Sequence, residues 1–241
     1  MEKGCAVVVG AGSGTGAEVA KRFAREGYGV AVARRNADAL ASLVAEIEHS
    51  GAKVKAFGAD ASDETEVATL FEEAEHALGP IEVVVFNAAG ITKSSILETT
   101  IDDFDLMWRA SALGGFLVGR EAARRMAVRG RGTILFTGAT ASIKASANFA
   151  AFAAGKHGLR AVAQSMAKEL GPKGIHVAHF IVDGVIDVPR VHEMMPDLAA
   201  AKGPDGLINA KSIAEAYLWV HNQPRDSWTF ELDLRPSIEP W

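Results

Sequence analysis

The chain has 241 residues, of which 49% are hydrophobic and 23% charged, a balance that suits one globular α/β core. Its 30 acidic and 25 basic residues give a net charge of -5. This excludes a general binder of nucleic acid or anionic membranes, because such partners attract an excess of Lys and Arg. Cys5 is the only cysteine, so we expect neither an intrachain disulfide nor a cysteine-based metal site.

No run of about 18 apolar residues is present, so no membrane span is expected. The first apolar run begins at Cys5, which leaves no room for a signal or transit peptide before it. We therefore expect a cytoplasmic protein. No spacing of His, Asp and Glu suggests a metal site.

Short apolar runs alternate with longer helical patterns along the chain. The runs predict strands at Ala6–Val9, Val30–Ala33, Val54–Phe57, Val83–Phe86, Thr133–Phe136, His176–Ile181 and Thr229–Leu234. Their nearly continuous hydrophobic character is typical of parallel strands buried on both faces. The alternation predicts an α/β fold in which residues 1–241 form a single Rossmann domain, a doubly wound parallel sheet of about seven strands with helices on both faces.

Two long helical patterns, 103–129 and 149–171, are richer in Ala and Gly than a surface helix requires. We expect them to pack against another subunit in a homodimer or homotetramer. The segment at about 188–210 contains prolines and glycines that interrupt the pattern, so we expect an irregular lid there. After it, Ser212–Glu215 has the form of a capping box that opens the last helix.

Residues 10–16 form a glycine-rich loop between the first predicted strand and the first predicted helix. Glycines let the backbone approach a phosphate, and a helix N-terminus offers free N–H donors to it. A tight connecting turn also explains glycines, but the strand–turn–helix setting favours the pyrophosphate of a dinucleotide. The predicted contacts are Gly10, Ser13, Gly14, Thr15 and Gly16.

Arg34 and Arg35 follow the second predicted strand, where an NAD site would place an Asp or Glu for the ribose 2′-hydroxyl. Guanidinium groups suit a 2′-phosphate, so the pair favours NADP over NAD, although a solvated pair at a helix start is the alternative. Asp60 and Ala61 follow the third strand. They are expected beside the adenine ring, or else in an ordinary surface turn.

The glycine spacing of the loop, together with an Asn-Ala-Ala-Gly segment directly after the fourth predicted strand, resembles the short-chain dehydrogenase/reductase superfamily. The order and spacing of the elements match over nearly the whole chain. The resemblance implies that this segment packs against the cofactor and steadies the central sheet. It assigns cofactor contacts to Asn87, Ala88, Ala89 and Gly90.

The catalytic half of the pattern departs from the family. Its members carry a Tyr-x-x-x-Lys pair whose i, i+4 spacing turns both side chains to one helix face, and here the pair is Phe152 and Lys156. The resemblance assigns Lys156 to the ribose hydroxyls and to catalysis, while the phenol that exchanges the proton is missing.

Two supporting positions also differ. The family's substrate-orienting Ser falls on Ala139, which leaves Thr140 and Ser142 as the nearest hydroxyls, and its helix Asn, which holds a relay water, falls on Ser111. We take Thr140, Ser111 and Lys156 as the candidate catalytic residues.

The family's Pro-Gly turn, which lines the nicotinamide pocket, appears here as an Asp-Gly pair. The resemblance places Gly184 and Ile186 at the cofactor. The groups available to replace the missing proton donor are Thr140, Ser142, Asp183, Asp187 and His192. For each of them a strand-end or loop residue facing solvent is the alternative.

Two functions of different class remain. The first is an NADP(H)-dependent oxidoreductase that acts on a carbonyl or alcohol through a non-standard proton donor. The second is a catalytically silent dinucleotide-binding protein, either a sensor or a structural partner. The loss of a positioned general acid removes about two to four orders of magnitude in rate, which weighs against the family's usual reduction but not against hydride transfer.

Overall fold

A computed structural model of the chain describes residues 3–203 and 205–239. Its main sheet has seven parallel strands in the order β3-β2-β1-β4-β5-β6-β9, which confirms the predicted doubly wound sheet. The strands are β1 (Cys5–Val9), β2 (Gly29–Arg34), β3 (Val54–Gly58), β4 (Ile81–Phe86), β5 (Gly132–Thr137), β6 (Ile175–Val182) and β9 (Glu231–Leu234).

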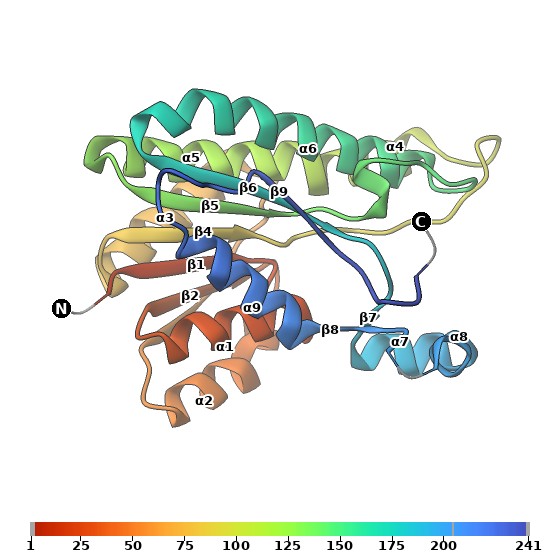
Figure 1. Cartoon of the computed structure of the whole chain (residues 1–241), viewed down its shortest axis with the longest axis horizontal. Helices are drawn as coiled ribbons and strands as arrows, with labels where there is room; N and C mark the ends of the chain where they lie inside the picture. Colours follow the sequence, from red (N-terminus) through yellow and green to blue (C-terminus); the bar gives the residue numbers. More distant parts are fainter. Residues whose placement is uncertain (1–2, 204, 240–241) are drawn as a thin grey trace.

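Helices cover both faces of the sheet (Figure 1). One layer holds α1 (Thr15–Arg25), α2 (Ala41–His49) and α9 (Ala210–His221); the other holds α3 (Glu64–Leu78), α4 (Ile101–Trp108), α5 (Gly114–Arg129) and α6 (Ala150–Leu170). Two apolar cores result, one on each face. All residues of β1 and β6 are buried, as the continuous hydrophobic runs predicted.

Local capping fixes where several helices begin. The Asp63 carboxylate accepts hydrogen bonds from the backbone N–H groups of Thr65 and Glu66, which starts α3. The last helix begins earlier than predicted, because Asn209 caps it through the Lys211 N–H. The predicted capping box at Ser212–Glu215 was therefore wrong: both residues lie inside α9.

The predicted helix over 103–129 is interrupted. A single π-helical turn, Arg109–Leu113, separates α4 from α5. Such turns are a single-residue adjustment of a helix and often lie at functional sites. This one carries Ser111, and it brings that residue against Gly155 of α6, where an added Cβ would lie 3.2 Å from Ser111 Cβ.

The segment predicted as an irregular lid is largely helical instead. It contains α7 (Pro189–Met194) and α8 (Pro196–Lys202), each with a proline in the first turn, where its fixed φ and missing N–H are tolerated. The short strands β7 (Ile186–Asp187) and β8 (Ile208–Asn209) pair in parallel and frame the two helices. Residue 204, inside this segment, lies outside the described residues.

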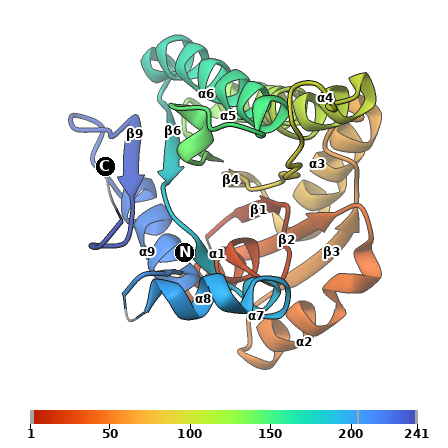
Figure 2. The same ribbon diagram turned by 90° about the vertical axis from the view of Figure 1, so that its right-hand side faces the viewer.

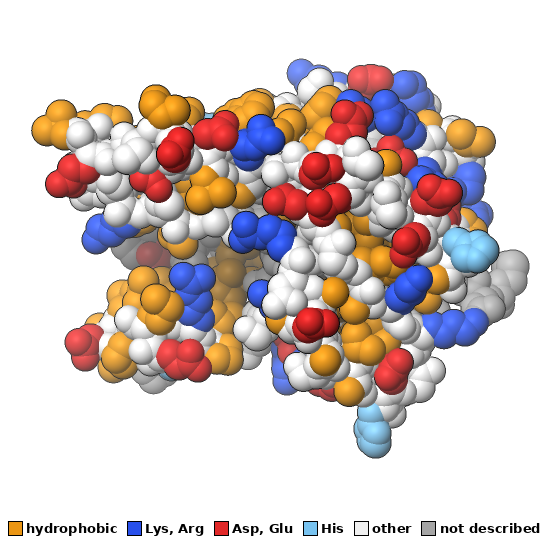
Figure 3. All heavy atoms as spheres, turned by 180° about the vertical axis from the view of Figure 1, so that it is seen from behind, with side chains coloured by type: hydrophobic (Ala, Val, Ile, Leu, Met, Phe, Trp, Pro, Cys, Tyr) orange, Lys and Arg blue, Asp and Glu red, His pale blue; other side chains and the backbone are white. Residues whose placement is uncertain are grey.

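The strand order reverses between β1 and β4, since β2 and β3 lie on one side of this point and β5, β6 and β9 on the other. Ligands of open α/β sheets bind at such a point, beyond the carboxyl ends of the strands. Figure 2 looks onto these ends, with α4 to α6 above them and α7 and α8 below. In Figure 3 the surface is deeply hollowed between the same two parts.

No helix in the described part of the chain is both long and apolar enough to cross a membrane. Within residues 3–203 and 205–239, His, Cys, Asp and Glu side chains do not form a group of three or more able to hold a metal ion.

A half-buried histidine, His221, links the amino-terminal ends of two strands. His221 Nε2 lies 2.7 Å from the Tyr28 hydroxyl, and Nδ1 lies 2.8 Å from Thr133 Oγ1. Burial lowers the pKa of His221 to about 4. Burial also lowers the pKa of His179 in β6 to about 4, because it outweighs the attraction of Glu231.

These two histidines predict that the fold loses stability on acidification. With a pKa near 6.5 when unfolded and about 4 when folded, each takes up its proton on unfolding, so the free energy of unfolding falls as the pH drops from 6.5 toward 4. Each contributes a slope of up to about 1.4 kcal/mol per pH unit.

Denaturant unfolding at about pH 7 and pH 5 measures this change in the free energy of unfolding. His221→Gln should flatten the slope, and the exposed control His49→Gln should not; equal slopes in all three proteins would contradict the account.

Candidate active site

A cleft of about 1090 Å³ opens at the carboxyl ends of β1 to β4. Its walls come from the glycine loop, the ends of β2 and β3, the segment after β4, and α4. Among the predicted cofactor residues it is lined by Gly10, Arg34, Arg35, Asp60, Ala61, Asn87, Ala88, Ala89 and Gly90. The structure therefore brings together residues from four separate loops of the sequence.

The glycine loop is held where a side chain would not fit. Gly10 has φ +88°, and a Cβ added to it would lie 2.4 Å from the backbone nitrogen of Ala88. A Cβ on Gly16 would lie 2.4 Å from the carbonyl oxygen of Gly10. By contrast, an added Cβ on Gly12 would meet no atom within 4 Å. Helix α1 has no side-chain cap at Gly14, so its first N–H groups are available to an anion.

Asn87 joins this loop to the end of β4. Its Nδ2 donates to the Gly10 carbonyl oxygen at 3.0 Å, and its backbone N–H donates to the Val9 carbonyl at 2.8 Å. These bonds fix the floor of the cleft at the point where the strand order reverses. They agree with the sheet-steadying part that the resemblance implied for Asn87.

The outer wall of the cleft carries charges of both signs. Arg34 is half-buried and Arg35 exposed, and neither forms an ion pair with another described residue. Asp60 faces them: despite partial burial, hydrogen bonds from Ser62 and the nearby Arg35 and Arg109 hold its pKa below the usual value. Arg109, from the π-helical turn, lines the same wall.

The remaining predicted cofactor residues lie outside this lining. Ser13 and Gly14 line a smaller pocket against the lid segment, and a Cβ on Gly14 would lie 2.7 Å from Val188 Cγ1. Thr15 and Gly16 are buried in the first turn of α1. Lys156, Gly184 and Ile186 lie on α6, after β6 and in β7 respectively, beyond the cleft as it stands.

Lys156 is the buried cation of the site. Its side chain is 3% exposed in α6, and Nζ donates to the Thr137 carbonyl at the end of β5, at 2.8 Å. Burial lowers its pKa from 10.5 to about 8, so this ammonium releases a proton more readily than an exposed lysine. Phe152 lies one turn earlier on the same helix and is half-buried.

Several candidate proton donors are unsuited to contact a substrate. Ser111 and Ser142 are completely buried; Ser142 Oγ accepts from the Ala139 N–H, and Ser111 Oγ has no partner among the described residues. Asp187 and His192 are exposed and pair with each other at 2.6 Å on the lid segment. The burial of Ser111 and Ser142 keeps both hydroxyls from direct contact with a substrate.

Thr140 and Asp183 meet at the ends of β5 and β6. Thr140 Oγ1 donates to Asp183 Oδ1, and Asp183 is only 3% exposed. Its other oxygen, Oδ2, lies 2.8 Å from Nη2 of Arg235, which follows β9. Thr140 and Asp183 are each candidates from the sequence, whereas Arg235 is not, although the convergence of parallel strand ends points to the residue after the last strand.

A family model described as short chain dehydrogenase matches residues 4–198 of the chain. The chain belongs to the short-chain dehydrogenase family. Among curated relatives, a 3-oxoacyl-acyl-carrier-protein reductase of Rattus norvegicus is 36% identical over 226 residues, which is 93% of either chain. The family relationship confirms the resemblance drawn from the glycine loop and the segment after β4.

Two solved structures are similar to this short-chain dehydrogenase family member over nearly its whole length. A short-chain dehydrogenase from Rhodopseudomonas palustris is 44% identical, with a TM-score of 0.83 over 96% of this chain and 98% of that one. A 7α-hydroxysteroid dehydrogenase, solved with NADH and 7-oxo glycochenodeoxycholic acid, is 28% identical with a TM-score of 0.89, over 98% of this chain and 94% of that one.

The backbone of the glycine loop gives a direct stability test. Gly10→Ala requires a strained φ and a collision with Ala88, so we expect a loss of more than about 1 kcal/mol in the free energy of unfolding. Gly12→Ala is the matched control, since its Cβ enters open space, and it should change stability little. Denaturant unfolding measures both; equal stability of the two variants would contradict the described packing of the loop.

Proposed function

We propose that this short-chain dehydrogenase family member is an NADP(H)-dependent oxidoreductase that interconverts a carbonyl and an alcohol. The observation that carries the proposal is the pair Arg34 and Arg35 at the mouth of the cleft, beside a glycine loop in which Gly10 and Gly16 have no room for a side chain. Two guanidinium groups that form no ion pair with a described carboxylate suit a ribose 2′-phosphate, which presents oxygens to planar donors.

The cleft residues fit such a cofactor along its length. The open first turn of α1 and the close-packed glycines suit the pyrophosphate. Ala61 and Asp60 suit the adenine side, and the segment 87–90 suits the central part. When bound, NADP supplies or accepts the hydride. Lys156, Gly184 and Ile186 would hold its nicotinamide half, and Lys156 is held in place by the hydrogen bond from its Nζ to the Thr137 carbonyl.

A second function is favoured by Phe152 alone. A phenylalanine at the family's tyrosine position has no proton to exchange, so the chain would then bind the dinucleotide without turnover, as a sensor or structural partner. This alternative shares every cofactor contact with the first. Only the presence or absence of turnover separates the two.

The α4–α5 surface suits a second copy of the chain, as expected for the homodimer or homotetramer. Phe104, Trp108 and Phe116 are 43%, 42% and 39% exposed, and apolar side chains of this size on neighbouring helices are typical of an interface. Light scattering would report a dimer or tetramer, and Phe116→Glu should shift it toward the monomer; a monomeric starting protein would contradict this part of the proposal.

The cofactor preference is tested by removing one charge. Arg35→Ala should weaken NADPH binding by about ten- to a hundredfold, the typical loss of a hydrogen bond to a charged group, and leave NADH binding unchanged. Titration calorimetry measures both. Arg131→Ala, which removes an exposed arginine paired with Glu82 at the other end of the sheet, is the control. Equal losses for both cofactors would contradict the assignment to the 2′-phosphate.

Turnover is tested with Lys156→Met, which keeps the length of the side chain and removes its donors. We expect oxidation and reduction rates to fall by about a hundredfold or more, because a positioned group at the reacting centre is lost. Lys168→Met, an exposed position on the same helix, should leave them unchanged. Intact NADPH binding without any turnover in the starting protein would overturn the oxidoreductase and support the silent binder.

A further inference from the structure

Thr140, Asp183 and Arg235 form a chain of polar contacts in which the donor and acceptor of each contact are fixed. Arg235 Nη2 lies 2.8 Å from Asp183 Oδ2, and the Thr140 hydroxyl donates to Oδ1, so each oxygen of the carboxylate faces a donor. An ionised carboxylate accepts hydrogen bonds and donates none. The Thr140 hydroxyl proton is therefore committed to Asp183 Oδ1.

This commitment sets what Thr140 offers to a ligand. A hydroxyl has one proton and two lone pairs, so Thr140 Oγ1 presents only acceptor sites on its remaining side. Asp183 is 3% exposed while Thr140 is half-buried, so of these two residues the threonine lies nearer the surface. A group that accepts in this way binds an alcohol O–H and does not bind a carbonyl oxygen.

We propose that Thr140 is the substrate-binding hydroxyl of this site, that it selects the alcohol over the carbonyl, and that Asp183 acts through it as the proton acceptor. The inference rests on the proposed function, because it assigns residues to that reaction.

The reaction balances with the alcohol and oxidised NADP as the only reactants. The alcohol O–H bond breaks and its proton moves to Thr140 Oγ1, while the Thr140 proton moves to Asp183 Oδ1. The C–H bond of the same carbon breaks as its electron pair leaves as hydride to oxidised NADP, and a C=O bond forms. The alcohol is oxidised and NADP is reduced.

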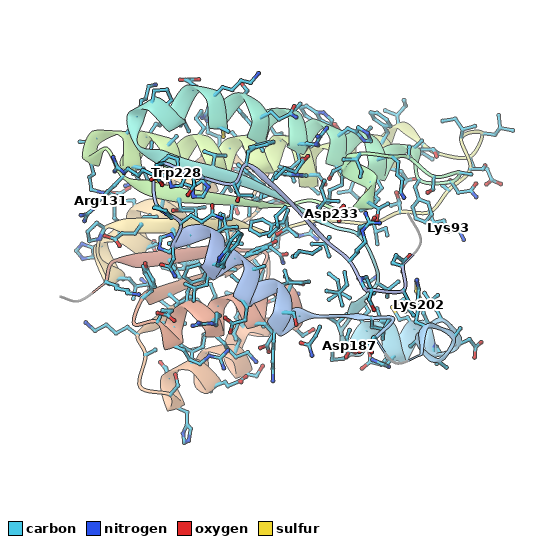
Figure 4. The ribbon with its side chains drawn as sticks, in the orientation of Figure 1. Lys93, Arg131, Asp187, Lys202, Trp228 and Asp233 are labelled. Carbon is cyan, nitrogen blue, oxygen red and sulfur yellow. The ribbon has the colours of Figure 1, made fainter. Side chains whose placement is uncertain are left out.

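Asp233 provides a matched control for Asp183. It also pairs with Arg235, at 2.7 Å, but among the described contacts it forms no hydrogen bond with Thr140. Figure 4 labels it on β9, the strand that runs beside β6. Substitution of Asp233 therefore perturbs the same guanidinium without touching the proposed proton path.

The experiment uses complexes that cannot react. Cyclohexanol, tetralol and menthol are titrated into the full chain with NADPH, and cyclohexanone, tetralone and menthone into the chain with NADP in its oxidised form, with affinities measured by calorimetry. The pair that turns over fastest is used for the variants. Thr140→Val should weaken alcohol binding about three- to tenfold, the loss of one neutral hydrogen bond, and leave ketone binding unchanged. Thr140→Ser, which keeps the hydroxyl, should restore alcohol binding.

The Asp183→Asn variant should change ligand preference more than the Thr140 variants do. Arg235 should attract the amide oxygen, which turns the amide nitrogen toward Thr140 as a donor. The Thr140 proton is then free to point at the ligand, so the preference should shift from the alcohol to the ketone, and the oxidation kcat should fall by about a hundredfold or more with little change in KM for NADP. Asp233→Asn should keep the alcohol preference and the oxidation rate.

The outcomes separate the two proposals. Bound NADPH without turnover of any member of the panel would remove the oxidoreductase, and this inference with it. Turnover in which Thr140→Val and Asp183→Asn alter alcohol and ketone binding equally, or not at all, would overturn the roles of these residues and leave the oxidoreductase standing.

Discussion

The close approach of two backbone segments, the glycine loop after β1 and the segment after β4, is the constraint on which the site depends. Gly10 lies so near Ala88 that no side chain fits between them, and Asn87 bonds the two segments together. Because β1 and β4 are neighbours at the point where the strand order reverses, this contact fixes the floor of the cleft.

The parts of the fold that the sequence predicts best are those set by local composition. The seven strands follow from continuous apolar runs, and the cleft follows from glycines and arginines at strand ends. The errors arose where a local sequence is compatible with more than one structure. The lid segment is helical because prolines can begin a helix as well as interrupt one. Asn209, an equally good cap, starts α9 ahead of Ser212.

The candidate catalytic centre also has features that follow from the sequence and features that depend on packing. Lys156 follows from a family spacing, whereas its burial and lowered pKa depend on how α6 packs against β5. The link from Thr140 to Asp183 joins residues 43 positions apart, and Arg235 enters from the last strand. The hydrophobic periodicity of the sequence does not predict such a contact. The absence of the family tyrosine is plain from sequence, while the polar chain beside it appears only when the strand ends are brought together.

The most direct test of the account is a crystal structure of the chain with oxidised NADP and the best alcohol of the panel. The account predicts the ribose 2′-phosphate within hydrogen-bond distance of Arg34 or Arg35, about 3 Å, the nicotinamide near Lys156, and the alcohol oxygen on Thr140 Oγ1. An empty cleft at saturating NADP, or a bound dinucleotide whose phosphates avoid the glycine loop, would contradict it.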